Sequence, residues 1–282
     1  MSSRLFHIVV AAAVGLALAG PAVARGYDDI VAAGEIVVAV YRDFPPFSDR
    51  VGGELAGVDV DLGKAIAERL KLKPVFMELT AAETVDDDLR NAVWKGHYLE
   101  RRVADVMLHV PVDRQFAQRN TNVVLAAPYF RERVVVARNP ERVNSRDDVD
   151  VFAQEKVGVE LASLADVYLT GRLAGRGASG NVVHFPTLAK AAEALTKGTV
   201  AAVMGTESEL AAALGGHGRD FPMGPMPSPG LSKPWWELGL AVKDGNRQLG
   251  YALDDVMTRL RSDGTVAAIF HRHGLPYLPP ED

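Results

Sequence analysis

Residues 35–70 read EIVVAVYRDFPPFSDRVGGELAGVDVDLGKAIAERL, and this stretch decides the fold. The apolar run over 36–40 predicts a short buried strand. The prolines and aromatic residues over 41–47 predict a turn, and the Gly-Gly pair at 52–53 is typical of a hairpin tip. An amphipathic helix is expected to follow the hairpin.

The helix is indicated by its apolar spacing. Leu62, Ile66 and Leu70 recur every four residues, which places them on one face, and Asp59 stands where an N-cap is expected. A strand, a loop and a helix in this order form half of a βαβ unit, whose loop lies at the carboxyl edge of a parallel sheet, where ligands bind. We therefore expect the loop over 41–47 to line a cleft.

Segments near both ends of the chain resemble a known family. DFPPFS at 43–48 and GVDVDLGKAIAERL at 57–70 resemble the first lobe of the periplasmic solute-binding proteins of the amino-acid-binding family. ELGLAVKDGNRQLGYALDDVMTRLRSDGTVAAIFHRHGL at 237–275 resembles that family's closing segment. The resemblance implies an α/β fold of the type II periplasmic-binding-protein kind, with a cleft between two lobes. Lobe 1 would comprise residues 25–131 and 235–282, and lobe 2 residues 132–234.

The middle of the chain has a tighter resemblance. LRNAVWKGHYLERRVADVMLHVPVDR at 89–114 is similar to the J-type accessory proteins, MoxJ and XoxJ, of periplasmic quinoprotein methanol dehydrogenases. This resemblance implies a non-catalytic periplasmic helper in methanol oxidation, with a quinoprotein methanol dehydrogenase as its partner and no cofactor of its own. Residues 97–102 look like an insertion, which is either a longer surface loop or a partner contact.

The N-terminus has the pattern of a secretory signal peptide. Arg4 precedes an apolar run over 8–18, and Ala-Val-Ala at 22–24 forms a small-residue cleavage site. A membrane anchor is the alternative, but a span needs about 20 apolar residues and this run is shorter. We expect residues 1–24 to be removed by cleavage near Ala24, and the protein to be exported to the periplasm.

The composition excludes several classes of function. Cleavage would leave 258 of the 282 residues, which is more than one hydrophobic core usually serves and favours two lobes. The mature chain would carry 30 basic and 36 acidic residues without a basic cluster, so nucleic acid is not an expected partner. The chain has no cysteine, which excludes disulfide, thiolate and iron–sulfur chemistry.

Strands alternate with helices beyond the first lobe, and such alternation predicts a parallel sheet. PYFRERVVVA at 128–137 is expected to cross into the second lobe. The expected strands cover 74–79, 104–110, 156–160, 182–185, 200–204 and 238–242, and the expected helices 163–173, 188–197, 207–214, 246–261 and 266–273.

Two clusters could be interpreted as metal sites, but neither is expected to bind a metal. Asp86, Asp87 and Asp88 open a short helix, and His271 and His273 lie near the end of another. Neighbouring residues on a helix point in different directions and cannot converge on one ion. Acidic groups in a first turn and cationic groups in a last turn are instead favourable against the helix dipole.

The segment 221–236, FPMGPMPSPGLSKPWW, contains five prolines and cannot form a sheet ladder or a helix interior. We expect an irregular loop close to the cleft mouth or the hinge. Its Met223, Met226, Trp235 and Trp236 either form a recognition surface, because aromatic residues and methionine are enriched in interfaces, or pack beneath the loop.

The family resemblance implies ligand-binding positions. Arg114 matches the arginine that holds the ligand carboxylate, and a guanidinium fork suits the two carboxylate oxygens. Thr206, next to Glu207, stands where the family has an acidic group for the ligand ammonium, and a hydroxyl cannot supply that charge. His109 stands where small hydroxyl residues usually lie. The candidate cleft residues are Phe44, His109, Arg114, Ser163, Thr206 and Glu207.

Two of these positions have other expected roles. Phe44 is the expected aromatic platform, and Ser163 can cap a helix whose N-terminus can hold an anion. With one anchor kept and one lost, the resemblance does not imply an ordinary amino-acid importer subunit. It fits the same fold adapted to another task, such as gripping a segment of a partner protein.

Two alternatives to the accessory role stay open. The first is a substrate-binding receptor of an ABC transporter for a small organic solute. The second is an enzyme similar to cyclohexadienyl dehydratases, in which Glu160 or Glu207 would act beside Arg114. No nucleophile elbow, P-loop, HExxH or EF-hand motif occurs in the sequence, and we expect a protein that is not an enzyme.

Overall fold

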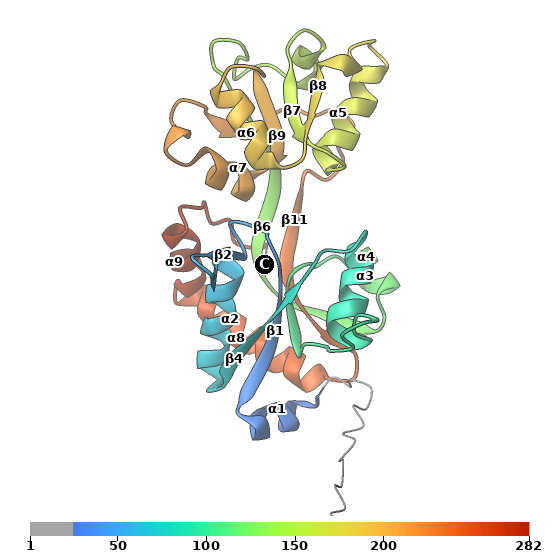
Figure 1. The fold of residues 1–282 in the computed structure, drawn as a ribbon, viewed down its shortest axis with the longest axis vertical. Helices are drawn as coiled ribbons and strands as arrows, with labels where there is room; N and C mark the ends of the chain where they lie inside the picture. The colour runs from blue at the N-terminus through green and yellow to red at the C-terminus, as the bar shows by residue number, and fades with distance from the viewer. Residues whose placement is uncertain (1–24, 282) are drawn as a thin grey trace, which may run out of the picture.

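The structure is a computed structural model that describes residues 25–281 (Figure 1). The expected signal peptide, residues 1–24, lies outside the described residues. Within the described part of the chain, no helix is long and apolar enough to cross a membrane. The fold is α/β with two lobes joined by two long strands, as expected from the sequence (Figure 1).

One sheet runs through both lobes. Its strand order is β4-β1-β5-β11-β6-β9-β7-β8, and β10 pairs with β6. Strands inside each lobe pair in parallel, whereas β6 and β11 pair antiparallel with each other and with their neighbours β9 and β5. The strands are β1 Glu35–Tyr41, β4 Lys73–Leu79, β5 Val106–Pro111, β6 Val123–Arg138, β7 Val157–Glu160, β8 Val182–Phe185, β9 Ala202–Thr206, β10 Met223–Gly224 and β11 Trp235–Lys243.

Helices flank the sheet in both lobes (Figure 1). The first lobe also carries a small hairpin of β2 Asp49–Val51 and β3 Glu54–Ala56. The α-helices are α1 Tyr27–Ala33, α2 Val58–Leu70, α3 Val85–Leu89, α4 Arg114–Arg119, α5 Leu164–Ala174, α6 Leu188–Thr196, α7 Glu207–Leu214, α8 Arg247–Ser262 and α9 Thr265–Arg272. A π-helix Arg90–Trp94 continues α3, and 3₁₀ turns cover Val149–Ala153, Ser179–Asn181 and Gly215–His217.

Each lobe has its own hydrophobic cores. In the first lobe, Leu62 and Ile66 of α2 are buried in a cluster with Val38 of β1, which confirms the helical face expected from their spacing. In the second lobe, Val157 of β7 and Leu169 of α5 belong to a separate cluster. The two lobes therefore carry separate cores, with the connecting strands between them.

The strand, turn, hairpin and helix expected over 35–70 are all present, but the N-cap was predicted wrongly. The helix begins at Val58, and its N-cap is Gly57 with a φ of 132°. A Cβ at this position would lie 2.2 Å from the carbonyl oxygen of Phe47, so the close approach of the two segments requires glycine. Asp59 is consequently inside the first turn and fully buried.

The connecting strands are longer than expected. β11 begins at Trp235 rather than at 238, so Trp235 and Trp236 belong to a strand and not to the proline-rich loop. They pair directly with Arg133 and Glu132 of β6. β6 itself begins at Val123 rather than at 128, because its first half pairs with the second half of β11. Such long-range pairing overrides the local pattern on which the sequence prediction depended.

Candidate functional site

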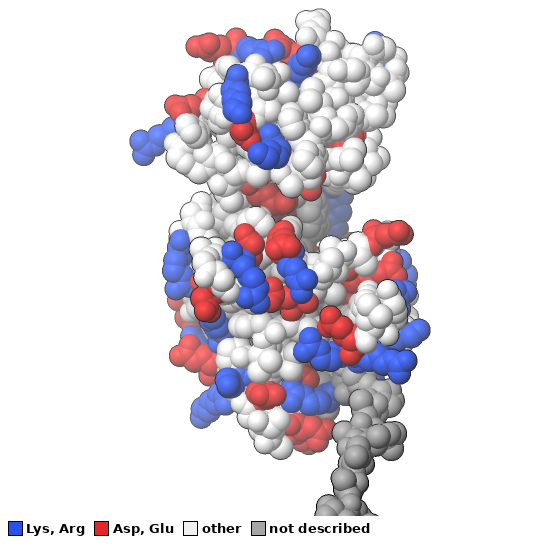
Figure 2. Space-filling model, in the orientation of Figure 1, with Lys and Arg blue, Asp and Glu red and all other residues white. Residues whose placement is uncertain are grey.

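A cavity of about 570 Å³ lies between the two lobes, beside the connecting strands. A second cavity of about 360 Å³ adjoins it beneath lobe 2 and shares four of its lining residues. Figure 2 shows the hollow between the lobes, with acidic side chains on both sides of it. The four shared residues are Phe44, Thr206, Glu209 and Trp236.

The strands of both lobes end at this cleft. Tyr41 is the last residue of β1, Thr206 of β9 and Glu160 of β7, and each lines one of the two cavities. The loop after β1 contributes Phe44 and Phe47 to the lining. The carboxyl ends of parallel strands from two lobes thus face each other, which is where α/β folds bind ligands.

His109 of β5 lies on the floor of the cleft. Its Nδ1 is 3.2 Å from Oδ2 of the buried Asp59. The hydroxyl of Tyr129 donates to Oδ1 of Asp59 at 3.0 Å and accepts the backbone N–H of His109 at 3.2 Å. The ring centroids of Phe44 and Phe47 lie 4.9 and 4.2 Å from that of the imidazole. These contacts hold the imidazole in one orientation.

Three backbone positions around the cleft are strained. His109 has a φ of 61°, Ala162 of 62° and Asp43 of 53°, although none of them is glycine. Left-handed backbone is unfavourable for residues with a Cβ and tends to persist at functional sites, where the surroundings impose it. His109 and Asp43 line the larger cavity, and Ala162 directly precedes Ser163 at the smaller one.

Three glutamates bring carboxyl groups into the cleft. Glu132 of β6 is 2% exposed, and burial raises its pKa to about 7 although its Oε1 accepts the backbone N–H of Arg133 at 2.9 Å. Burial also raises the pKa of Glu209, whose Oε2 accepts the hydroxyl of Thr206. The pKa of Glu160 is raised by burial as well. These groups hold protons more firmly than exposed carboxyl groups do.

The structure places four of the six candidate cleft residues in the lining. Phe44, His109 and Thr206 line the larger cavity, and Ser163 lines the smaller one. The hydroxyl of Ser163 caps α5 by accepting the backbone N–H of Asp166 at 3.2 Å. The ligand contacts expected for these side chains stay a prediction.

The other two candidates have different surroundings. Glu207 forms a two-pronged ion pair with Arg133, with both N···O distances at 2.7 Å. Arg114 is the first residue of α4, is exposed, and is not among the lining residues of either cavity. Glu160 does line the smaller cavity, so the structure does not gather Arg114 with Glu160 or Glu207 in one pocket.

Sequence reasoning missed several residues that build the cleft. Glu132 and Glu209 supply its inner carboxyl groups, and Asp59 and Tyr129 support His109. Asp59 carried a signal, because a carboxylate between the apolar residues of a first helical turn is unusual unless something binds it. Glu132 and Glu209 carried none, since their orientation depends on strand pairing and helix phase.

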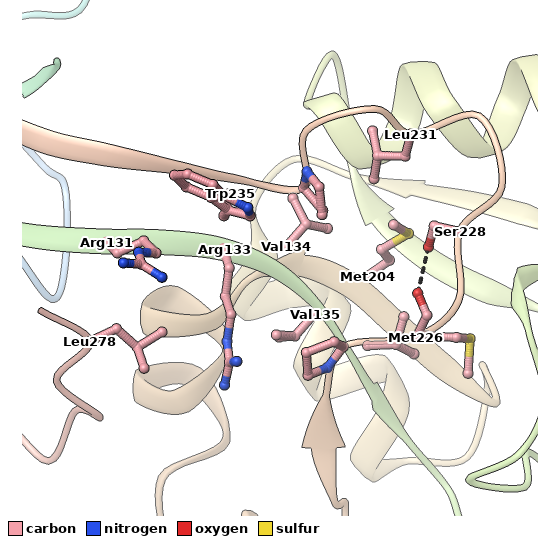
Figure 3. Close-up of a pocket in the computed structure, with 13 residues that line it drawn as sticks. Arg131, Arg133, Val134, Val135, Met204, Met226, Ser228, Leu231, Trp235 and Leu278 are labelled. Carbon is pink, nitrogen blue, oxygen red and sulfur yellow. Dashed lines mark hydrogen bonds between the residues drawn. The ribbon is translucent and has the colours of Figure 1, made fainter. Parts of the chain in front are cut away.

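The two adjacent tryptophans point to opposite sides of the connecting strands. Trp236 lines the cleft, whereas Trp235 lines a different cavity of about 360 Å³ (Figure 3). Met226 and Arg131 also line that cavity, and the guanidinium of Arg131 lies 5.1 Å from the Trp235 ring. Met223 lies in the short strand β10. The partner surface expected from these methionines and tryptophans stays a prediction.

The acidic and histidine clusters have local partners. Asp86 accepts from Arg119 at 3.2 Å, and Nε2 of His273 lies 3.0 Å from Asp61. Among residues 25–281, no group of three or more histidine, aspartate or glutamate side chains could hold a metal ion.

Comparisons with known proteins bear on this two-lobed fold. The family model of the bacterial extracellular solute-binding proteins, family 3, matches residues 36–93. Among solved structures, an ancestral cationic amino acid solute-binding protein is 18% identical, with 88% of this chain and 98% of that chain covered and a TM-score of 0.66. The chain has the fold of a type II periplasmic binding protein. No curated protein matches its sequence.

Two further structures show how widely this fold is used. An amino acid ABC transporter substrate-binding protein from Streptococcus pneumoniae, bound to L-arginine, is 17% identical, with coverages of 89% and 98% and a TM-score of 0.62. A histidine kinase sensor domain with similarity to periplasmic binding proteins is 22% identical, with coverages of 87% and 98% and a TM-score of 0.58. At such identities the likeness establishes the fold, and the ligand has to be argued from the cleft.

Proposed function

We propose that this chain is the substrate-binding receptor of an ABC transporter and captures a small organic solute in the cleft between its lobes. The observation that carries the proposal is the cavity of about 570 Å³, which is lined by residues of both lobes and of the strands that connect them. A ligand in this position contacts both lobes at once and favours their closure around it.

Two features of the comparisons support this function. The match to the solute-binding family covers the segments 41–47 and 81–88, which contribute the first-lobe side of the cleft lining. Two of the similar structures are amino acid ABC transporter substrate-binding proteins bound to L-arginine. Volumes of several hundred Å³ are typical of sites for small ligands.

A thermal-shift screen of small organic solutes tests the receptor function. A ligand that binds only the folded state stabilises it by about 2.7 kcal/mol when its concentration is 100 times its Kd. We expect at least one class of amine, amino acid or other small solute to raise Tm in a concentration-dependent way. A broad screen in which no solute changes Tm would contradict the proposal.

The accessory role in methanol oxidation is a second candidate function. It derives from the resemblance of residues 89–114 to MoxJ and XoxJ, and one structural feature favours a protein contact there. The loop between the π-helix and β5 exposes Tyr98 by 77% and Leu99 by 72%. Isolated exposed apolar residues are common, but two adjacent ones on a loop can serve as a partner contact.

A pull-down with a periplasmic quinoprotein methanol dehydrogenase tests this second candidate. Under the accessory hypothesis, the wild-type chain retains the dehydrogenase and a Tyr98→Ser, Leu99→Ser double variant releases it. The exposed Tyr251→Ser variant on α8 is the control, because that side chain is 71% exposed and lies on another element. Failure of the wild-type chain to retain the enzyme would contradict the accessory role.

A dehydratase-like activity has less support. One similar structure is described as an ancestral amino-acid-binding protein that is a precursor of cyclohexadienyl dehydratase. The acid and the arginine that such chemistry would use, Glu160 or Glu207 with Arg114, do not line one cavity together. Turnover of prephenate or arogenate, lost in an Arg114→Ala variant, would overturn this preference for binding over catalysis.

A further inference from the structure

The inner wall of the cleft has a surplus of acidic groups. Of the side chains that line the larger cavity, the only ones with a basic group are Arg42 and His109, and Arg42 is exposed at the rim. Glu160 adds another carboxyl group from the smaller cavity. The acidic residues that line the larger cavity are Asp88, Glu132 and Glu209 inside it, and Asp43 and Glu83, which are exposed like Arg42.

The two arginines that flank Glu132 on β6 are engaged with other carboxylates. Arg133 binds Glu207 through both prongs, and Arg131, on the opposite face of β6, pairs with Glu281 at 3.0 Å. Glu132 and Glu209 receive hydrogen bonds from a backbone N–H and a threonine hydroxyl instead. Among the described residues neither carboxyl group forms an ion pair with a lysine or arginine, so each can bind a cation brought by a ligand once it is ionised.

Aromatic rings line the same cavity as these carboxyl groups, and Trp236 is the cross-strand neighbour of Glu132. Phe44 and Tyr41 come from the first lobe, with their ring centroids 5.7 Å apart, and Trp236 comes from β11. Aromatic faces attract cations through their quadrupole, and tryptophan does so most strongly. A cation in this cavity is attracted both by the rings and by the ionised carboxyl groups of Glu132 and Glu209.

We propose that the cleft is selective for an organic cation that carries no carboxylate, namely an alkyl guanidine or amine. This inference rests on the proposed receptor function and specifies its ligand. A free amino acid would bring its carboxylate into a cavity that already holds several acidic side chains. Arg114, the expected carboxylate clamp, lies outside the lining residues.

A ligand in the larger cavity can contact both lobes and so favour their closure. Glu209 and Thr206 belong to the second lobe, Phe44 belongs to the first, and Glu132 and Trp236 lie on the connecting strands. A cation that contacts all three parts is bound most tightly when the lobes approach each other. Recognition and closure would then depend on the same contacts.

Isothermal titration calorimetry at pH 8 with two matched pairs tests the selectivity. Agmatine is arginine without its carboxylate, and cadaverine is lysine without its carboxylate. We expect the amine of each pair to bind at least tenfold more tightly than the amino acid. Equal or tighter binding of arginine or lysine would overturn the inference and leave the receptor function standing.

A broader set of solutes separates this inference from the proposed function. If a neutral sugar or an organic acid binds while all four probes do not, the cation inference is overturned and the receptor function survives. If no solute of any class binds, both are overturned. Binding of agmatine or cadaverine above the matched amino acid supports both.

Single substitutions test which carboxyl groups bind the amine. Glu132→Gln and Glu209→Gln are each expected to weaken binding of the preferred amine at least tenfold, and Glu68→Gln on the exposed side of α2 is the control. Thermal melts verify that each variant is folded. Loss of amine binding in Arg114→Ala, with unchanged binding in Glu132→Gln, would overturn the inference, because the ligand would then depend on the arginine.

Discussion

Burial raises the pKa of Glu132 from an ordinary 4.5 to about 7, and this shift makes the stability of the protein depend on pH. Between these values the native state binds more protons than the unfolded chain, so stability is fullest below about pH 4.5 and falls as the pH rises through about 7. Replacing Glu132 by glutamine removes the ionisation and keeps an oxygen for the Arg133 N–H.

We therefore expect Glu132→Gln to increase the free energy of unfolding at pH 8 by about 3 kcal/mol and to change it little at pH 4. Urea unfolding of wild type and variant at both pH values measures the difference. Glu68→Gln is the matched control on an exposed surface and should be neutral. A Glu132→Gln variant that is less stable than wild type at pH 8 would show that the carboxylate is compensated in the native state.

The same carboxyl group should make amine binding depend on pH. His109 from β5, Glu209 from α7 and Arg133 from β6 interact electrostatically with Glu132. Below about pH 7 the cation has to displace a proton from Glu132, so affinity should fall by up to tenfold per pH unit. Calorimetry with agmatine between pH 5.5 and 8.5, in buffers of different ionisation enthalpy, measures both the slope and the released proton.

Among individual residues, the sequence identified some that line the cleft and missed others for a physical reason. Phe44, His109 and Thr206, which line the cavity, were chosen because the family resemblance implies ligand-binding positions there. Glu207 was chosen from the sequence, but Glu209 lines the cavity. Residues two apart on a helix point about 200° away from each other, and only the packing of α7 decides which of them faces the cleft. Burial of Glu132 depends on its pairing with Trp236, far away in the sequence.

The alternation of side chains along β11 decides which of its residues reach the cleft. Successive side chains of β11 point to opposite faces, so Trp236 lines the cleft and Trp235 lines the other side. The two residues thus provide a matched pair with the same chemistry on the same strand. Trp236 also packs against the cores of both lobes, which makes it sensitive to their relative position.

We expect Trp236→Phe to weaken amine binding severalfold and to abolish most of the ligand-induced change in tryptophan fluorescence. Trp235→Phe should leave both nearly unchanged. Fluorescence titration with agmatine compares the two variants with wild type. An equal effect of both substitutions would indicate that the signal comes from the strand as a whole and not from the cleft.

Elements were predicted best where the pattern was local. The strand, hairpin and helix over 35–70 were found because periodicity and glycine positions specify them within a few residues. The cap at Asp59 was predicted wrongly because the required residue is Gly57, whose contact with the Phe47 carbonyl is visible only in the folded chain. The full lengths of β6 and β11 follow from the pairing of the two strands with each other and not from the composition of either strand.

For the whole molecule, the two lobes are joined by β6 and β11. Lys233 reaches Asp113 at 3.1 Å across the boundary, and Trp236 packs on both sides. Relative motion of lobes connected in this way needs only small changes in the connecting strands. A ligand that contacts both lobes can shift such an equilibrium in proportion to its preference for the closed state.

We expect saturating agmatine to decrease the radius of gyration measured by small-angle X-ray scattering, because the cation would contact both lobes through Phe44 and Glu209. The Glu132→Gln chain, which keeps the fold and loses the carboxylate, should show no decrease at the same concentration. Arginine, which differs by one carboxylate, serves as the ligand control. Binding of agmatine without a change in scattering would place the ligand on one lobe alone and contradict closure around a shared cation.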